Sequence, residues 1–386
     1  MKILFISRDF PNMSGGVSDY TYHLSNALSE NMFEIYVLTS KDKRVISQQK
    51  NNINILPVTE KWNVKSLLSV IEEINKIKPN RVMLQYVPYM YAHYGMPIYI
   101  AILAVILNLL GFKLLTTFHE IAIRLYFRKP KYWIIGFFQR LIAYVICISS
   151  NKIVVSNKHY KDMLWLFGKK ISLVAMGSNI LPIDVSDSER AQLKKKISPP
   201  ADFIISSFGS NPRKNDLLLD VIKRFKDEGI LIKLLFIGNY PRDWVQSIKI
   251  AAKEKNIEDL IYITGLIEPQ EVYKHLTISD VFIQLENIDR KGWGGVSTRS
   301  TTLAAAYAAG LPIIGNQGEM TDDFFHNKEN ILLIDSLNIY VLFSAIKSLM
   351  RDKELQQTLR NGALQTFKMQ LDWKVIVNKY MVLLNN

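Results

Sequence analysis

Four short segments of the sequence carry residue types that bind anions or move protons. The first, residues 10–20, places Gly15 and Gly16 after an apolar run and before a helical pattern. Paired glycines let the backbone approach a ligand, and the free N–H groups of a helix start favour phosphate. The segment matches neither G-x-G-x-x-G nor G-x-x-x-x-G-K-[ST], so neither a dinucleotide site nor a P-loop is indicated. A tight turn without a ligand is the alternative.

The second segment, residues 116–120, ends an apolar run with His119 and Glu120. A histidine at the carboxyl end of a strand can hydrogen-bond a substrate hydroxyl or help hold a reacting group, with Glu120 fixing its orientation. A satisfied structural histidine is the alternative. The position at the strand end favours the functional role.

The third and fourth segments are predicted to bind anions. Residues 207–216 place Arg213 and Lys214 in a short turn before a helix start, which suits a diphosphate, although a solvated basic turn is the alternative. Residues 292–312 join a glycine-rich loop, a hydroxyl-rich helix start containing Arg299, and an Ala-rich helix that leads to Gly-Leu-Pro. Pure helix capping is the alternative there, and this segment is the most specific of the four.

Alternating strands and helices must position these segments. Apolar runs predict strands, and helical periodicity separates them, which favours βαβ units and parallel sheets. The strands are predicted at residues 3–6, 34–38, 81–86, 114–118, 152–156 and 172–175, and again at 203–206, 233–237, 261–264, 281–284, 312–315 and 331–334. We therefore expect two tandem doubly wound, Rossmann-like α/β domains. Ligands bind at the carboxyl ends of such strands, so a cleft between facing domains is the expected site.

The polar stretch at residues 184–202, with Pro199 and Pro200 near its end, is the predicted linker. An N-terminal domain then spans residues 1–183 and a second domain spans 203–365. The chain of 386 residues, with 48% hydrophobic and 22% charged residues, is too long for one ordinary core and excludes a disordered or fibrous protein. Its single cysteine, Cys147, indicates a reducing compartment.

The net charge of +13 is concentrated in the first half of the chain. Residues 1–180 hold 22 Lys and Arg against 10 Asp and Glu, and residues 181–386 hold 26 against 25. We therefore expect the first half to attract an anionic partner. Nucleic acid is disfavoured as that partner because the second half is nearly neutral and no known binding module occurs.

Residues 124–140 combine basic and aromatic side chains and predict an interfacial membrane patch, with core packing as the alternative. Its named candidates for acceptor or membrane contact are Arg124, Arg128, Lys129, Lys131 and Trp133. The most lipid-like run, Met96–Leu110, is shorter than a bilayer span, and the N-terminal apolar run is too short for a signal peptide. We expect a cytoplasmic protein that is peripheral on the inner face of the cell membrane.

The sequence resembles the GT-B glycosyltransferases of the large retaining family called family 4, or glycosyl transferases group 1. The resemblance rests on the order and spacing of the four segments, on Ala-x-x-Gly-Leu-Pro-Ile-Ile and on the closing helix that begins at Trp373. The resemblance covers nearly the whole chain. It implies a C-terminal domain that binds a UDP- or GDP-linked sugar and an N-terminal domain that binds the acceptor. It also implies that residues 366–386 cross back onto the first domain.

The resemblance assigns roles residue by residue. It implies that His119 lies beside the transferred sugar. The implied donor-binding residues are Gly15, Gly16, Ser210, Arg213, Lys214, Leu266, Ser297, Thr298, Arg299 and Ser300. The chain departs from the family at the two glutamates eight apart, whose places hold Ser297 and Ala305, and at the usual arginine of the diphosphate turn, which is Ser210. We hypothesise that Glu286 and Arg299 substitute.

The expected reaction is transfer of a hexose or related sugar to a glycan acceptor, with retention of configuration. A polyprenyl-diphosphate-linked acceptor is expected, as in cell-surface polysaccharide, O-antigen or capsule biosynthesis. No Asp-x-Asp occurs, so cations and helix dipoles would meet the leaving-group charge, and neither a metal nor a cofactor is expected. The main alternative is a degenerate GT-B subunit that binds without transfer, and a sugar-nucleotide epimerase is a lesser one.

Overall fold

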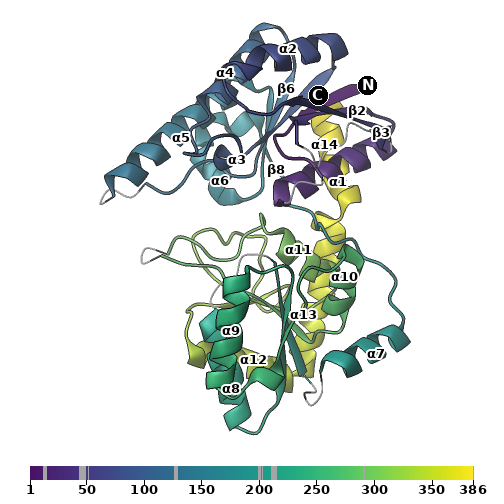
Figure 1. Cartoon of the computed structure of the whole chain (residues 1–386), viewed down its shortest axis with the longest axis vertical. Coiled ribbons are helices and arrows are strands. Elements are labelled where there is room, and N and C mark those ends of the chain that lie inside the picture. The colour runs from purple at the N-terminus through teal and green to yellow at the C-terminus, as the bar shows by residue number, and fades with distance from the viewer. Residues whose placement is uncertain are drawn as a thin grey trace. The chain divides into compact units, whose positions relative to one another are not determined.

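The chain forms two compact α/β units in the computed structural model (Figure 1). The first unit consists of Met1–Gly177 and Trp373–Asn386, and the second consists of Ser178–Asp372. The structure describes residues 1–11, 15–42, 49–50, 52–125, 129–198, 201, 203–209, 215–289 and 292–385. Both units are doubly wound sheets, as the alternation of apolar and helical patterns predicts.

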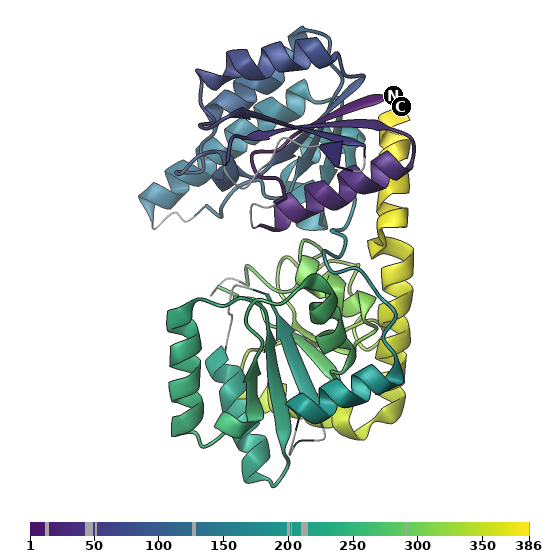
Figure 2. The same cartoon turned by 45° about the vertical axis from the view of Figure 1, so that its right-hand side comes forward.

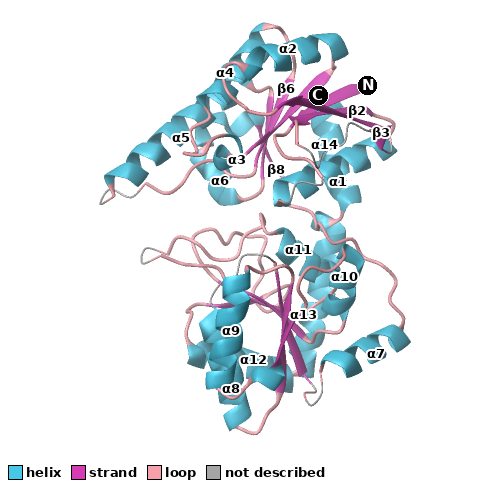
Figure 3. Ribbon diagram, in the orientation of Figure 1, coloured by secondary structure: helices cyan, strands magenta, loops and turns pink. Residues whose placement is uncertain are grey.

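The first unit is built on an eight-stranded sheet in the order β3-β4-β2-β1-β5-β6-β7-β8, drawn in magenta in Figure 3. All neighbouring strands are parallel except β3 and β4. The strands are β1 (Lys2–Ile6), β2 (Glu34–Ser40), β3 (Gln49–Lys50), β4 (Ile53–Thr59), β5 (Arg81–Tyr86), β6 (Leu114–Phe118), β7 (Lys152–Val155) and β8 (Ile171–Leu173). From β1 the chain adds strands on one side up to β4 and on the other side from β5 onward. The topological switch point, where doubly wound domains bind ligands, therefore lies between β1 and β5.

The first and the last long helices of the chain cover one face of this sheet. Alternate strand residues such as Phe5 and Met83 form one buried cluster with side chains of α1 and α14, which lie side by side in Figure 2. Right-handed crossovers put α2, α4 and α5 on the opposite face. The helices are α1 (Gly16–Glu30), α2 (Ser66–Ile77), α3 (Pro88–Tyr91), α4 (Ile98–Leu109), α5 (Pro130–Ser149), α6 (Lys158–Met163), the 3-10 turn η1 (Trp165–Lys170) and α14 (Trp373–Asn385).

The second unit has a fully parallel sheet in the order β11-β10-β9-β12-β13-β14. Its strands are β9 (Phe203–Phe208), β10 (Ile232–Ile237), β11 (Ile261–Ile263), β12 (Val281–Gln284), β13 (Ile313–Asn316) and β14 (Leu332–Ile334). Its helices are α7 (Asp187–Ile197), α8 (Asn215–Asp227), α9 (Arg242–Glu254), η2 (Glu258–Leu260), α10 (Pro269–Thr277), α11 (Thr301–Ala308), α12 (Ile339–Arg351), α13 (Lys353–Thr366) and the π-helical turn η3 (Phe367–Leu371). The topological switch point of this sheet lies between β9 and β12.

The structure differs from the sequence-based expectation in the linker and in several elements, which include β3 and α3. The chain passes between units at Gly177, and the stretch expected as a linker, residues 184–202, contains helix α7 of the second unit. Ser186 and Glu189 close a capping box at the start of that helix. Strand β4 and helix α13 were not anticipated, because Pro57 interrupts the strand pattern and the helix is rich in polar residues.

Candidate functional site

His119 lies at the carboxyl end of β6 and contacts residues of two neighbouring elements. Strands β5 and β6 pair in parallel, and the backbone N–H of His119 donates to the carbonyl of Tyr86 at 3.0 Å. This register brings the Nε2 atom of His119 to 2.8 Å from Oε1 of Gln85. The side chain that binds the imidazole is therefore Gln85, where the sequence analysis expected Glu120.

The environment of His119 keeps its imidazole neutral. The side chain is buried, and loss of hydration lowers its pKa to about 3. An amide oxygen can only accept a hydrogen bond, so Nε2 carries the proton and Nδ1 keeps its lone pair. The ring of Tyr20, from α1, packs edge-on against it at a centroid distance of 5.0 Å. His119 can thus accept a hydrogen bond from a ligand hydroxyl through Nδ1.

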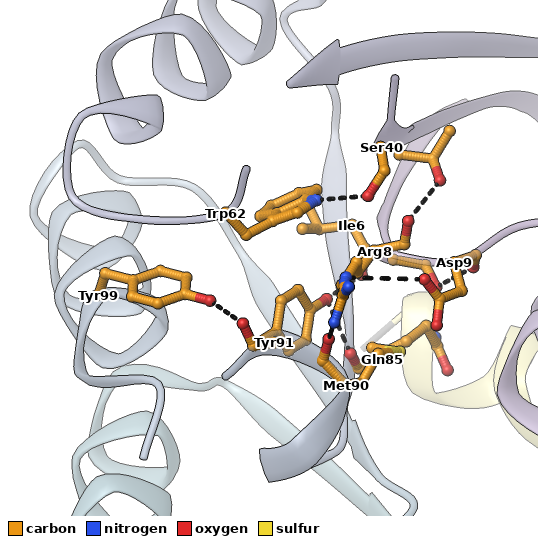
Figure 4. A network of polar contacts seen from close by, with 11 residues as sticks. Ile6, Arg8, Asp9, Ser40, Trp62, Gln85, Met90, Tyr91 and Tyr99 are labelled. Atoms are coloured by element: carbon orange, nitrogen blue, oxygen red, sulfur yellow. Dashed lines mark hydrogen bonds and ion pairs between the residues drawn. The ribbon is translucent and has the colours of Figure 1, made fainter. Parts of the chain in front are cut away.

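A polar network fixes the carboxyl ends of β1 and β5 (Figure 4), and it includes Gln85, the partner of His119. The hydroxyl of Tyr91 lies 3.0 Å from the carbonyl oxygen of Gln85 and 3.3 Å from that of Ile6. The Arg8 guanidinium donates to the carbonyl of Met90. These contacts join α3 to the strand ends, so the position of Gln85 is set by its backbone as well as its side chain.

Gly15 and Gly16 lie at the start of α1, after β1. A Cβ atom built on either glycine has no neighbour within 4 Å among the described residues, so packing does not demand glycine there. Gly15 has φ of +156°, whereas Gly16 has no unusual φ. The space beside this helix start is consistent with the predicted ligand contact.

In the second unit a chain of hydrogen bonds joins Glu286 to the start of α11. The Nε2 atom of Gln284 donates to Oε1 of Glu286 at 2.8 Å, and the Thr302 hydroxyl donates to Oε1 of Gln284 at 3.2 Å. The Ser300 and Thr302 hydroxyls lie 3.0 Å apart. This chain links the Glu286 carboxylate, through Gln284, to the helix start that the sequence predicts as an anion site.

The backbone of Glu286 is anchored by Asn316, which ends β13. The amide N–H of Glu286 donates to Oδ1 of Asn316 at 2.7 Å, and Nδ2 of Asn316 donates back to the Glu286 carbonyl at 3.0 Å. Asn316 is completely buried, so this paired contact excludes water. It fixes where the chain leaves β12.

The four residues before α11 differ in their surroundings. Ser300 caps the helix, because its Oγ accepts from the backbone N–H of Leu303 at 3.2 Å. Ser297 and Thr298 are buried, and Arg299 is half-buried. The capping alternative therefore applies to Ser300, which leaves Arg299 as the cationic side chain of this segment.

Leu266 follows the end of β11 and is 81% exposed. Close by, the backbone N–H of Gly238, which follows β10, donates to the Thr264 hydroxyl at 3.0 Å. An exposed leucine beside a strand end fits the predicted contact with a planar base.

Ser210, Arg213 and Lys214, predicted for the diphosphate turn, lie outside the described residues.

In the basic and aromatic segment 124–140, some side chains are buried in the first unit and others are exposed at its surface. Arg128 lies outside the described residues. On α5, Gln139 and Arg140 hold the backbone of Ile123, through hydrogen bonds of 2.7 and 2.8 Å. Trp133 is half-buried and stacks on Phe137. Lys129 and Lys131 are exposed and Arg124 is half-buried. The core-packing alternative holds for one face of α5, and the other face is exposed.

Helix α5 is the one helix within the described ranges that is long and apolar enough to cross a membrane, by length and composition only. Core helices of soluble proteins meet the same criterion. The run that the sequence marks as most lipid-like, Met96–Leu110, corresponds to α4, which is shorter than α5. The described part of the chain contains no group of three or more His, Cys, Asp or Glu side chains arranged to hold a metal ion.

Gln85, Gln284 and Asn316 are site residues that were not predicted from the sequence. Each is a polar residue at or near the carboxyl end of an apolar buried strand, as in Val-Phe-Ile-Gln and Ile-Ile-Gly-Asn. A polar side chain in that position has to find a partner, because an unpaired buried polar group is costly. That pattern is the sequence feature that marks them.

Two family models match consecutive parts of the chain. Residues 14–179 match the model described as Glycosyltransferase Family 4, and residues 187–366 match the model described as Glycosyl transferases group 1. A search of curated proteins found no match.

Solved structures share the whole fold at low sequence identity. HepE from Anabaena, in complex with UDP and glucose, aligns over 100% of this chain and 99% of its own, with a TM-score of 0.74 and 12% identity. Sucrose-phosphate synthase from Thermosynechococcus elongatus aligns over 100% and 98%, with a TM-score of 0.75 and 15% identity. WaaG, a glycosyltransferase involved in lipopolysaccharide biosynthesis, aligns over 100% of both chains, with a TM-score of 0.62 and 12% identity. With the two matched families, this shared fold identifies the chain as a glycosyltransferase of the GT-B fold.

Proposed function

We propose that the protein transfers a hexose or related sugar from a UDP- or GDP-linked donor to a glycan acceptor, and that the second unit binds the donor. The observation that carries this proposal is the hydrogen-bonded chain from Glu286 through Gln284 to the start of α11. It links a carboxylate, a group that can accept hydrogen bonds from sugar hydroxyls, to a helix start, where backbone N–H groups favour phosphate. The complex of HepE with UDP and glucose supports a nucleotide-sugar as donor.

Glu286 takes the place of the missing glutamate pair in this proposal, and Arg299 takes part in phosphate binding. In this proposal Gly15 and Gly16 complete the diphosphate contacts together with Ser210, Arg213 and Lys214. Leu266 packs on the base. Cations and helix N–H groups neutralise the departing diphosphate, so the transfer needs no divalent metal and no cofactor.

His119 holds the transferred sugar through Nδ1, which accepts a hydrogen bond from a sugar hydroxyl. Its lowered pKa keeps Nδ1 unprotonated throughout the physiological range, so this acceptor is always available. We further propose that the anomeric configuration is retained. NMR of the product formed from a donor of known configuration tests that proposal, and an inverted product contradicts it.

The proposed acceptor is a polyprenyl-diphosphate-linked glycan, reached from a membrane surface by the first unit. Helices α4 and α5 pack against each other and expose apolar side chains. These are Ile98, Ile102, Val105 and Leu109 on α4, and Tyr132, Ile134, Phe137, Phe138, Leu141 and Ile148 on α5. Exposed Lys129 and Lys131 adjoin them at the start of α5. An apolar face edged with lysines suits an anionic bilayer surface. WaaG, which acts in lipopolysaccharide biosynthesis, has the same fold.

A thermal-shift screen tests the donor proposal directly. The purified protein is heated with UDP, GDP, ADP or their sugar conjugates, with and without EDTA. We expect one nucleoside diphosphate to raise the Tm by several degrees, because a ligand at a hundred times its Kd adds about 2.7 kcal/mol to the free energy of unfolding. The increase should be unchanged by EDTA.

Transfer is then measured with the stabilising donor and lipid-linked acceptors. Stabilisation without transfer to any acceptor favours the degenerate subunit that binds donor only. If no nucleotide stabilises the folded protein, the donor proposal is wrong.

A further inference from the structure

The C-terminal helix α14 contributes the phenol of Tyr380, which hydrogen-bonds to one residue of β6 and one residue of α1 near His119. The hydroxyl of Tyr380 lies 3.0 Å from the Thr117 hydroxyl and 3.0 Å from the Tyr20 hydroxyl. All three side chains are fully or almost fully buried. A phenol donates one hydrogen bond and accepts another, so Tyr380 satisfies both partners at once.

Both partners of Tyr380 adjoin His119. Thr117 precedes it by two residues on β6 and therefore points to the same face of the sheet. The ring of Tyr20 packs edge-on against the imidazole at 5.0 Å, with an interplanar angle of 80°. Trp373, which begins α14, also packs against Tyr20, at a centroid distance of 5.1 Å.

We propose that Tyr380 is a positioning residue for His119. By fixing Thr117 and Tyr20, α14 holds the imidazole in the one orientation in which Nε2 binds Gln85 and Nδ1 is left for a substrate hydroxyl. Buried hydrogen bonds orient their partners strongly because water does not compete for them. The consequence for transfer rests on the proposed role of His119. The consequence for the geometry of the imidazole does not.

The test compares two buried phenols of the first unit. Tyr380→Phe keeps the ring and removes both hydrogen bonds. Tyr86→Phe is the matched control, because the Tyr86 hydroxyl is buried and has no hydrogen-bond partner among the described residues. Two measurements are made on each variant: the steady-state kinetics, and the ring resonances of His119 in protein with isotope-labelled histidine. The spectrum of His119→Gln assigns those resonances.

We expect Tyr380→Phe to lower kcat about tenfold, with little change in the donor KM, and to shift the His119 resonances. Tyr86→Phe should do neither. Thr117→Val removes only one of the two bonds and should give an intermediate shift, which keeps the test decisive if Tyr380→Phe folds poorly. The proposal is overturned if the resonances of His119 do not move in Tyr380→Phe or Thr117→Val.

The two proposals fail in different ways. If the resonances move while Tyr380→Phe and His119→Gln both keep wild-type rates, Tyr380 positions the imidazole and the proposed role of His119 in transfer is wrong. If kcat falls with unchanged resonances, Tyr380 acts by another route, and the positioning proposal is wrong.

Discussion

Gln85 and His119 are 34 positions apart in sequence and are joined by a hydrogen bond of 2.8 Å between Oε1 and Nε2. The bond determines which imidazole nitrogen carries the proton. Gln85→Glu replaces the amide with a carboxylate of the same shape, which favours the charged imidazole and raises the pKa of His119. We expect the acidic limb of the pH–rate profile to move to higher pH by about one unit or more.

Gln85→Met is the control for that substitution, since it removes the acceptor without adding charge. It should lower kcat about tenfold and leave the acidic limb unmoved. Identical profiles for Gln85→Glu and the wild-type protein would contradict a role for this pair in transfer.

Burial of His119 also makes stability depend on pH. Its native pKa of about 3 lies below the ordinary value of 6.5, so the unfolded chain binds the extra proton as the pH falls. The stabilisation is complete above about pH 6.5 and is lost progressively down to about pH 3. Between pH 7 and 5.5 the loss is about 1 kcal/mol.

Denaturant titrations of the wild-type protein and His119→Gln at these two pH values check this prediction. The variant should lose about 1 kcal/mol less than the wild-type protein. His275, whose pKa is also lowered by burial, is present in both proteins and contributes the same background. An equal loss in the two proteins would show that His119 is not the titrating group.

Glu286→Gln and Arg299→Ala should each lower turnover by about tenfold to a hundredfold, which is the effect expected when one charged contact is lost. Glu286→Gln keeps the shape of the side chain and removes the charge at the end of the hydrogen-bonded chain. The exposed residues Glu254 and Arg351 offer matched controls, as Glu254→Gln and Arg351→Ala. Wild-type rates in both site variants would remove Glu286 and Arg299 from the reaction.

Gly294 lies where a side chain cannot be accommodated. Its φ is +128°, and a Cβ atom there would be 1.8 Å from the carbonyl oxygen of Asn287. Gly294→Ala should cost roughly 2–4 kcal/mol and lower the Tm by about 5–10 °C. Gly168→Ala is the control, because its Cβ would meet no atom of the described residues within 4 Å and its φ is not strained. Equal melting temperatures for the two variants would contradict the crowding at Gly294.

The exposed face of α4 and α5 predicts salt-sensitive binding to anionic vesicles. Lys129→Glu with Lys131→Glu should weaken binding, by about 1 kcal/mol for each basic residue lost near the surface. Phe137→Ser should weaken it through lost apolar contact. Ile250→Ser, at an equally exposed apolar position in the second unit, is the control. Flotation that is equal for all these variants, or absent for the wild-type protein, would remove the membrane part of the proposal.

The sequence alone predicted the two doubly wound sheets and most of their strands, because apolar periodicity is a local property that each segment carries within itself. It also identified His119 at a strand end and the hydroxyl-rich start of α11. It missed β4, where Pro57 breaks the pattern, and it read residues 184–202 as linker although Ser186 and Glu189 form a capping box for α7.

Only the tertiary structure decided which side chains meet. Gln85 reaches His119 through the register of β5 and β6, and Tyr380 reaches Thr117 and Tyr20 because α14 packs on α1. Asn316 holds Glu286 because β13 lies beside β12. These pairs are separated by tens to hundreds of residues, so no local pattern encodes them. Strand order, register and helix packing bring them together, and these are set by burial of the whole core.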